Sequence, residues 1–407
     1  MGIQDIIGIV LLVCCGVGVV GSSQVFADEH SIDLTRVVTG NNAFGMTLYQ
    51  HMAEGTGNLF ICPYSIRTAL LMTFAGAQKE TAAQMARVLS IQEPVSDIHQ
   101  AAHAWQEALK AGSDERQGYR LQIANALWGQ QGYAFQAAFV EQLNSAYGGG
   151  LHEVDFTHAL EEARQTINAW VEQKTGGQIS EFLKPQSLDP SVMLVLTNSV
   201  YFKGAWTFPF DPQKTMPGPF FIHADQSVDV PMMSQTLTTA YGEDDAQQVI
   251  ELPYGGERLS MVVIVPKQLD GLRRIEQQLS AQTVNQALER LRPQKIMVTL
   301  PRWSMETEVS LPDILRELGM TDAFALPAAD FSGMTGGKDL YISAVLHKAV
   351  LDVTEEGAEA AAATEVSMSR GLRRTPEIFA DRPFLVMILD RQTGGILFIG
   401  RVMDPRG

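Results

Sequence analysis

Apolar residues recur at helical intervals mainly in the early part of the chain, and gather in β-rich runs later on. In residues 41–52, for example, Phe44, Leu48 and Met52 follow one another at a spacing of four residues. This kind of pattern predicts helices at residues 41–52, 64–78, 79–89 and 160–174. Apolar, β-branched runs bounded by Gly, Pro and charged residues predict strands at residues 121–130, 191–206, 259–266, 295–303 and 340–353. Strands interrupted by helices indicate a mixed α+β fold.

The composition is that of a folded protein, with 45% hydrophobic and 19% charged residues in a chain of 407. A formal charge of −16 without a sustained basic patch argues against nucleic acid as a partner, because phosphate-backbone binding depends on clustered Lys and Arg. The chain contains no fixed-period repeat and no long polar linker. We therefore expect residues 28–407 to form a single domain.

The first 27 residues have the pattern of a removable export signal. An apolar run covers residues 6–21, and Val25–Ala27 fits a small-residue cleavage site. This pattern predicts a secreted or otherwise extracytoplasmic protein. Residues 1–5 contain an Asp and no Lys or Arg, so an uncleaved membrane anchor is the alternative.

The same segment contains a match to the dinucleotide-binding pattern GxGxxG, formed by Gly16, Gly18 and Gly21. That pattern needs a strand before it and a helix after it, so we discard the match inside an export segment. Cys14 and Cys15 would leave with the signal. Cys62 would then be the only cysteine of the mature protein, which predicts that it has no internal disulfide.

Residues 354–384 lie between two predicted core strands and contain the alanine-rich run EEGAEAAAATE. Helix propensity alone favours an exposed helix here. Read as a strand from Ala358 onward, the run places Ala358, Ala360, Ala362 and Thr364 on one face and Glu359 and Glu365 on the other. A strand whose inward face is small and uncharged can enter a crowded sheet without burying a charge.

This run and several other segments in order resemble the serpins, and in particular their inhibitory members. The resemblance rests on NLFICPYSI (58–66), INAWVEQKTGGQI (167–179), NSVYFKGAW (198–206), ADFSGMT (329–335), HKAVLDVTEEG (347–357) and DRPFLVMILDRQTGGILFIGRVMDP (381–405). It implies a serpin fold with a large central mixed β-sheet, two smaller sheets, about nine helices and an exposed reactive-centre loop near residues 355–382.

The resemblance implies an irreversible suicide inhibitor of serine proteases, with cysteine proteases as a second target class. The protease attacks the loop, an acyl-enzyme forms, and the cut loop inserts into the central sheet with the protease attached. Ala358 is the first inward residue after the hinge glycine, so it is critical for insertion. The hinge residues are Glu355, Gly357, Ala358, Glu359, Ala360, Ala361, Ala362, Ala363 and Thr364.

The scissile bond has two candidate positions. Counting from Gly357 by the family's spacing places it after Gly371, whereas counting back from Pro383 places it after Leu372. Arg370 is our lead specificity residue, because arginine fills the acidic primary pocket of trypsin-like proteases. Leu372 would instead indicate chymotrypsin-, elastase- or subtilisin-like targets. The arginines near this bond could also serve only to keep an exposed loop soluble.

The resemblance also assigns roles beneath and beside the sheet. It implies a polar shutter cluster made of Cys62, Pro63, Ser65, Asn198 and His347. Each polar member has the plain alternative of a hydrogen-bonded core residue. Cys62 stands where the family usually has serine, and we expect its weaker hydrogen bonding to loosen the cluster. Trp206 is either simple core packing or the breach residue where insertion begins, and the resemblance favours the breach.

Inhibition has one main alternative among the functions that the sequence allows. A non-inhibitory serpin acting as carrier, chaperone or storage protein is the main alternative, although the hinge has no bulky or charged inward residue. We expect no enzyme, no metal and no cofactor, and we interpret His99 and His103 as a solvated helix face because they lack the HExxH context. Residues 97–110 contain one Lys and no Arg, so no heparin-type cofactor is indicated. The expected protein is a monomer whose partner is the target protease.

Overall fold

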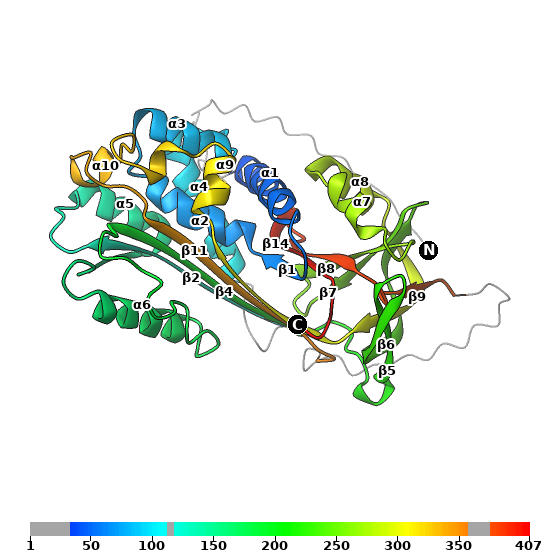
Figure 1. The fold of residues 1–407 in the computed structure, drawn as a ribbon. Coiled ribbons are helices and arrows are strands. Elements are labelled where there is room, and N and C mark those ends of the chain that lie inside the picture. Colours follow the sequence, from blue (N-terminus) through cyan, green and yellow to red (C-terminus); the bar gives the residue numbers. More distant parts are fainter. Residues whose placement is uncertain (1–32, 112–117, 357–374) are drawn as a thin grey trace, which may run out of the picture. The chain divides into compact units, whose positions relative to one another are not determined.

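The computed structural model describes residues 33–111, 118–356 and 375–407, in which ten α-helices and fourteen strands form (Figure 1). The helices are α1 (Thr35–Met52), α2 (Pro63–Phe74), α3 (Lys79–Val88), α4 (Val95–Ala111), α5 (Ala137–Tyr147), α6 (Leu160–Lys174), α7 (Leu272–Gln277), α8 (Ala281–Glu289), α9 (Pro312–Glu317) and α10 (Ser332–Thr335). The strands are β1 (Leu59–Ile61), β2 (Tyr119–Gln130), β3 (Leu151–Val154), β4 (Leu194–Gly204), β5 (Met216–His223), β6 (Gln226–Glu243), β7 (Gln247–Pro253), β8 (Leu259–Pro266), β9 (Arg292–Pro301), β10 (Trp303–Ser310), β11 (Ala344–Val353), β12 (Glu377–Phe379), β13 (Phe384–Asp390) and β14 (Gly395–Val402). The predicted α+β class is confirmed.

Five strands form a mixed sheet in the order β10-β11-β4-β2-β3. Its two middle strands, β11 and β4, run parallel and pair over nine residues of each, from Ala344 with Val195 to Asp352 with Lys203. The flanking pairs β10/β11 and β4/β2 are antiparallel. The edge pair β2/β3 is parallel, so the sheet is mixed, as the resemblance implies for the central sheet.

The other strands form a nine-stranded sheet in the order β1-β14-β13-β8-β7-β6-β9-β12, with β5 paired to β6. Two smaller sheets were expected. Strand β6 joins them, because its 18 residues pair with β5 and β9 along most of their length and with β7 near Tyr241. A single long strand therefore makes the two expected sheets continuous.

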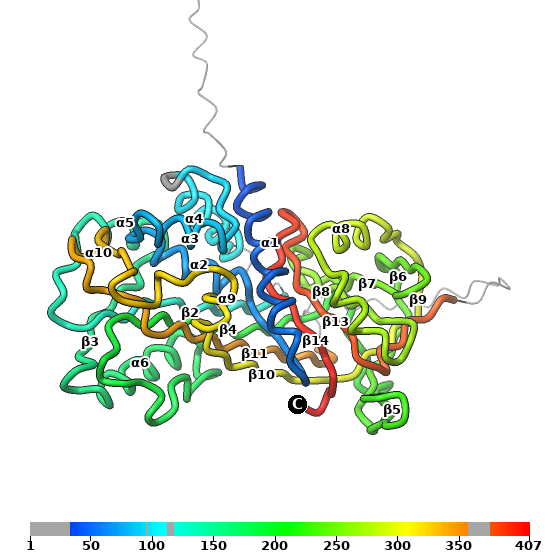
Figure 2. Tube along the Cα trace, turned by 45° about the horizontal axis from the view of Figure 1, so that its top comes forward, coloured from blue at the N-terminus to red at the C-terminus, as the bar shows by residue number. Residues whose placement is uncertain are grey.

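Helices cover both faces of the five-stranded sheet. Helix α2 is buried at all twelve of its positions and lies on the same side as α1 and α4, whereas α6 lies on the opposite face (Figure 1). Helix α1 runs beside β14 and α2 (Figure 2). The buried residues of α6, Ala163, Ile167 and Val171, follow a four-residue spacing, so a single apolar stripe packs on the sheet.

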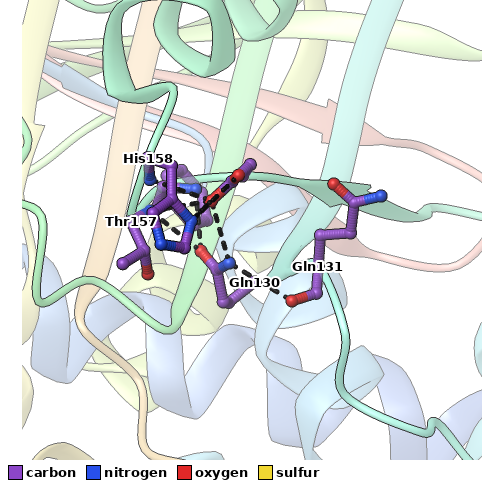
Figure 3. A network of polar contacts seen from close by, with 6 residues as sticks. Gln130, Gln131, Thr157 and His158 are labelled. Carbon is purple, nitrogen blue, oxygen red and sulfur yellow. Dashed lines mark hydrogen bonds and ion pairs between the residues drawn. The ribbon is translucent and has the colours of Figure 1, made fainter.

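A polar network fixes the turn that leads into α6 (Figure 3). The side-chain oxygen of Gln130, at the end of β2, accepts the backbone N–H groups of Phe156 at 2.7 Å and Thr157 at 3.2 Å. The carboxylate of Asp155 accepts the backbone N–H of His158 at 3.0 Å. The start of α6 is thereby tied to the edge region of the five-stranded sheet.

Candidate functional site

The described end of the predicted hinge follows directly on β11, which ends at Val353. Trp206, just beyond the end of β4, holds this segment: its Nε1 donates to the carbonyl of Thr354 at 2.8 Å, and its backbone N–H donates to that of Glu356 at 3.0 Å. The indole also stacks on Tyr254 with ring centroids 4.6 Å apart. The residue that the sequence assigns to the breach therefore bonds the chain at the point where it leaves the sheet.

The two acids at this point are held differently. Glu355 is buried, and its Oε1 accepts a hydrogen bond from Thr215 Oγ1 at 2.7 Å and lies 3.8 Å from a guanidinium nitrogen of Arg302. Glu356 is exposed and pairs with Lys203 at 2.6 Å. Because a buried carboxylate depends on its partners far more than an exposed one, Glu355 is the stronger tie.

The far side of the loop attaches to the other sheet. The carbonyl of Pro376 accepts the backbone N–H of Met297 at 3.0 Å, and β12 then pairs in parallel with β9 of the nine-stranded sheet. The two ends of the loop are thus anchored on different sheets. The other hinge residues (Gly357, Ala358, Glu359, Ala360, Ala361, Ala362, Ala363 and Thr364) and the reactive-bond residues (Arg370, Gly371 and Leu372) lie outside the described residues and stay predictions.

Strand register places three polar side chains in one row across the five-stranded sheet. Asn125 of β2 faces Asn198 of β4, which faces His347 of β11. Asn198 Nδ2 donates to Asn125 Oδ1 and to Ser65 Oγ, and Ser65 Oγ donates to Asn125 Oδ1 at 3.0 Å. The structure therefore brings together three of the residues predicted for the shutter, Ser65, Asn198 and His347, at the contact between the sheet and α2.

The hydrogen bonds of His347 define its protonation. Its Nε2 receives the backbone N–H of Cys62 at 3.3 Å, so Nε2 must be the acceptor and Nδ1–H the donor to Asn198 Oδ1. Complete burial lowers the pKa of His347 to about 3, because the charged ring would lose its hydration. His347 is therefore neutral at physiological pH and serves as a structural link between β11 and β4.

Cys62 and Pro63 begin α2. Pro63 lies in the first turn of the helix, where a backbone N–H would have no partner within the helix, so its absence costs nothing. Cys62 precedes it as a free, buried cysteine. Burial raises the pKa of the Cys62 thiol, so the sulfur is uncharged. The bond to His347 uses the backbone N–H of Cys62, which a serine would also supply. The substitution thus leaves this link intact.

Comparison with known proteins decides the family. The serpin family model, described as serine protease inhibitor, matches residues 39–405. The chain belongs to the serpins. Human leukocyte elastase inhibitor is 38% identical to this serpin over 384 residues, covering 91% of this chain and 100% of that protein. An uncharacterized serpin-like protein of Thermococcus kodakarensis is 40% identical over 375 residues, covering 91% of this chain and 86% of that protein.

Solved structures agree with the fold of this serpin. Uncleaved ovalbumin matches with a TM-score of 0.82 and 27% identity, covering 91% of this chain and 100% of that chain. A structure of maspin matches with a TM-score of 0.85 and 27% identity, covering 91% and 99%. These likenesses confirm the serpin fold that the motifs imply.

Asn125 is the member of the polar row that sequence reasoning missed. It lies in the apolar run of residues 121–130, and its Nδ2 also donates to the backbone carbonyl of Ser65 at 3.3 Å. A short amide side chain in the middle of a predicted core strand was the available signal, because an amide removed from water requires partners.

The interpretation of His99 and His103 as a solvated face is wrong for His99. This side chain is buried in the serpin, and its Nδ1 lies 2.7 Å from the hydroxyl of Tyr147 on α5. Burial lowers the pKa of His99 to about 4. His103 is half-buried, with its Nδ1 3.1 Å from the carbonyl of Ala146. The pair contacts α5, a neighbour that the helical spacing of α4 could not reveal.

Within the described ranges of this serpin, no group of three or more His, Cys, Asp or Glu side chains is arranged to hold a metal ion. None of the helices in those ranges is long and apolar enough to cross a membrane.

Proposed function

We propose that this serpin traps a protease irreversibly, and that its cleaved loop inserts between β11 and β4. The observation that carries the proposal is the parallel pairing of these strands, with the hinge leaving from the end of β11. A strand that returned from Val353 would run antiparallel to β11 and therefore to β4 as well. Insertion would replace one parallel ladder by two antiparallel ones, which are slightly more stable per residue.

The predicted hinge supports insertion sterically. Its inward residues Ala358, Ala360 and Ala362 are small and uncharged, so they would enter the sheet with little displaced volume. About 15 inserted residues at roughly 3.3 Å each would carry an attached protease on the order of 50 Å. Movement over that distance would take the acyl-enzyme from one end of the sheet to the other.

We assign the polar row to control of this opening. β4 and β11 are linked by Asn198 and His347, and β4 is linked to α2 by Asn198 and Ser65. These bonds must be rearranged when a new strand separates β4 from β11. The breach contacts of Trp206 with Thr354 and Glu356 would be released at the same time.

We propose Arg370 as the specificity residue and a trypsin-like protease as the target. Arginine matches an acidic primary pocket. Leu372 remains the alternative, and the relative named leukocyte elastase inhibitor supports it because elastase-like pockets accept aliphatic side chains. The two assignments place the cut at different bonds.

The test mixes the purified protein with trypsin, chymotrypsin or subtilisin and separates the products on denaturing gels. A band at the summed mass, which survives denaturation, supports covalent trapping, and the mass of the small fragment identifies the bond. Ala358→Arg should abolish the band and leave only cleavage, because a charge would have to enter the sheet. Ala361→Arg, one residue from the inward positions on either side, is the matched control and should retain most trapping.

Loop cleavage without the band for every protease would instead support the non-inhibitory alternative. An undiminished band with Ala358→Arg would contradict insertion itself. We also propose that residues 1–27 direct export and are removed, and that the mature protein is a monomer without a heparin-type cofactor. N-terminal sequencing of the natural protein and its molar mass in solution test these points.

A further inference from the structure

The gap between β4 and β11 is also bridged at the end farthest from the hinge. β4 begins at Leu194 and β11 at Ala344, so Met193 and Ser343, the residues just before them, lie at this end. The backbone N–H of Met193 donates to Ser343 Oγ at 2.9 Å, and the backbone N–H of Ser343 donates to the carbonyl of Leu194 at 2.8 Å. The two chains are therefore bonded to each other where the parallel ladder starts.

A second bridge joins the helices that lead into the two halves of the sheet. α5 connects β2 to β3 and so belongs to the β4 side of the gap, whereas α10 precedes β11. The two helices lie side by side at this end of the sheet (Figure 1 and Figure 2). Gln136, directly before α5, donates its backbone N–H to the carbonyl of Met334 at 2.7 Å and its Nε2 to the carbonyl of Ser332 at 3.3 Å. We call these contacts of Ser343 and Gln136 the distal latch.

The distal latch differs from the contacts at the hinge end. Trp206 and Lys203 hold Thr354 and Glu356, which belong to the segment that would itself move into the sheet. The distal latch instead joins the two sides of the gap directly to each other. Because a polar group removed from water is costly to leave without a partner, these bonds resist separation until new partners arrive.

The length of the gap places the distal latch at the last step of insertion. A strand that runs back along β11 must pair with about eleven residues, from Val353 to Ser343, before it reaches the latch. Reversal of the chain after Val353 takes about four residues, so about 15 residues beyond Val353 bring the strand to Ser343. The candidate bonds near residues 370–372 lie only about two to four residues farther along the chain.

From these contacts we infer that the distal latch controls the completion of insertion, and that Ser343 and Gln136 are its positioning residues. The gap opens from the hinge end, and the latch bonds are the last to break. While they hold, the strand stops short and the acyl bond to the protease remains open to hydrolysis. This inference rests on the proposed insertion and adds a late control point to the earlier one at the polar row.

Hydrogen exchange of the intact protein tests the distal latch without a protease. Ser343→Ala removes the acceptor of the Met193 N–H, so this end of the gap should open more often. We expect exchange of the amides at residues 195–197 to become about fivefold faster. Amides near the hinge, at residues 201–203, should exchange as in the parent protein.

Two further variants serve as controls for this experiment. Ser343→Thr keeps a hydroxyl at the same position and should exchange as the parent does. Ser304→Ala also removes a serine hydroxyl, one that donates to Asp352 Oδ1 at 2.7 Å, but this bond joins β10 to β11 on one side of the gap. It should leave exchange at residues 195–197 unchanged.

The role in insertion is tested with the protease mixtures and denaturing gels described above. The ratio of trapped to cleaved product should rise severalfold in Ser343→Ala, because the last part of the gap opens more readily. Gln136→Ala should raise it less, since the backbone bond to Met334 remains. A purely structural role for Ser343 would lower the melting temperature without raising this ratio.

Unchanged exchange at residues 195–197 in Ser343→Ala would overturn the distal latch. Faster exchange with an unchanged or lower ratio of trapped to cleaved product would overturn its control of insertion. If the parent protein forms no trapped band with any protease, the proposed inhibition fails. The exchange experiment would still decide whether Ser343 holds this end of the gap closed.

Discussion

The two sheets differ in what they bury. The middle strands of the nine-stranded sheet, β8, β13 and β14, are buried along their whole length and almost entirely apolar there. The five-stranded sheet is buried along most of β4 but contains Asn198 and His347 across the parallel pair β4/β11. A hydrogen bond that is replaced by another hydrogen bond costs little net free energy, whereas opening an apolar region exposes its buried surface to water. Under the proposed insertion, the nine-stranded sheet would remain closed, whereas the five-stranded sheet contains bonds that an added strand would replace.

The largest effect should come from damaging the closed sheet. Phe398 of β14 stacks on Phe60 with centroids 5.0 Å apart and also contacts Phe202. Phe398→Ala should lower the free energy of unfolding by about 3–5 kcal/mol, because it leaves a cavity in a fully buried region. Denaturant unfolding measures this change. Phe208→Ala, at a side chain that is 47% exposed, is the control, and similar losses for both would contradict the comparison.

A smaller effect is expected from the polar row. Asn198→Ala removes the acceptor of His347 and the donor to Ser65 and Asn125, so buried groups lose partners. The free energy of unfolding should fall by about 2–3 kcal/mol. Unlike Phe398→Ala, this change should also speed spontaneous opening of the sheet, measured as hydrogen exchange in β4. Asn285→Ala on the exposed surface of α8 should change neither quantity. Hydrogen exchange in β4 that is no faster in Asn198→Ala than in the parent protein would argue against a role in opening.

Lowering the pH should weaken the same polar row without a mutation, and so lower the free energy of unfolding. The pKa of His347 is about 3 in the folded protein and near 6.5 when unfolded, so the unfolded state binds the extra proton between these values. This contribution to stability is complete above pH 6.5 and is lost as the pH falls toward 3, by about 1.4 kcal/mol per pH unit. His347→Gln should flatten the dependence. An equally steep profile in that variant would assign it to other groups, such as His99.

The smallest effect separates the two acids at the hinge. Glu355→Gln keeps the shape of the side chain but removes its charge beside Thr215 and Arg302, and should cost about 1 kcal/mol. Glu356→Gln affects only an exposed ion pair and should cost less than about 0.5 kcal/mol. Thermal melting of the two variants gives the comparison. Equal shifts of the melting temperature in the two variants would mean that burial of Glu355 does not strengthen its contacts.

The sequence predicted the helices and strands better than the contacts between them. Apolar, β-branched runs predicted strands in both sheets, namely β2, β4, β8, β9 and β11. The ordered motifs indicated the serpin fold and the grouping of Ser65, Asn198 and His347. The role of Asn125 and the burial of His99 were not predicted, because each depends on a partner distant in sequence. The partner is Ser65 for Asn125 and Tyr147 for His99. The joining of two sheets by β6 likewise depends on pairing partners that strand length alone does not specify.

Anchoring the loop ends on different sheets has a consequence for the cleaved molecule. A cut near residue 371 would separate a C-terminal piece of about 35 residues that includes β12, β13 and β14. Both β13 and β14 lie inside the nine-stranded sheet, between β8 and β1. The nicked product would therefore behave as a noncovalent two-chain complex, eluting as a single particle in native chromatography and dissociating only when the sheet itself unfolds.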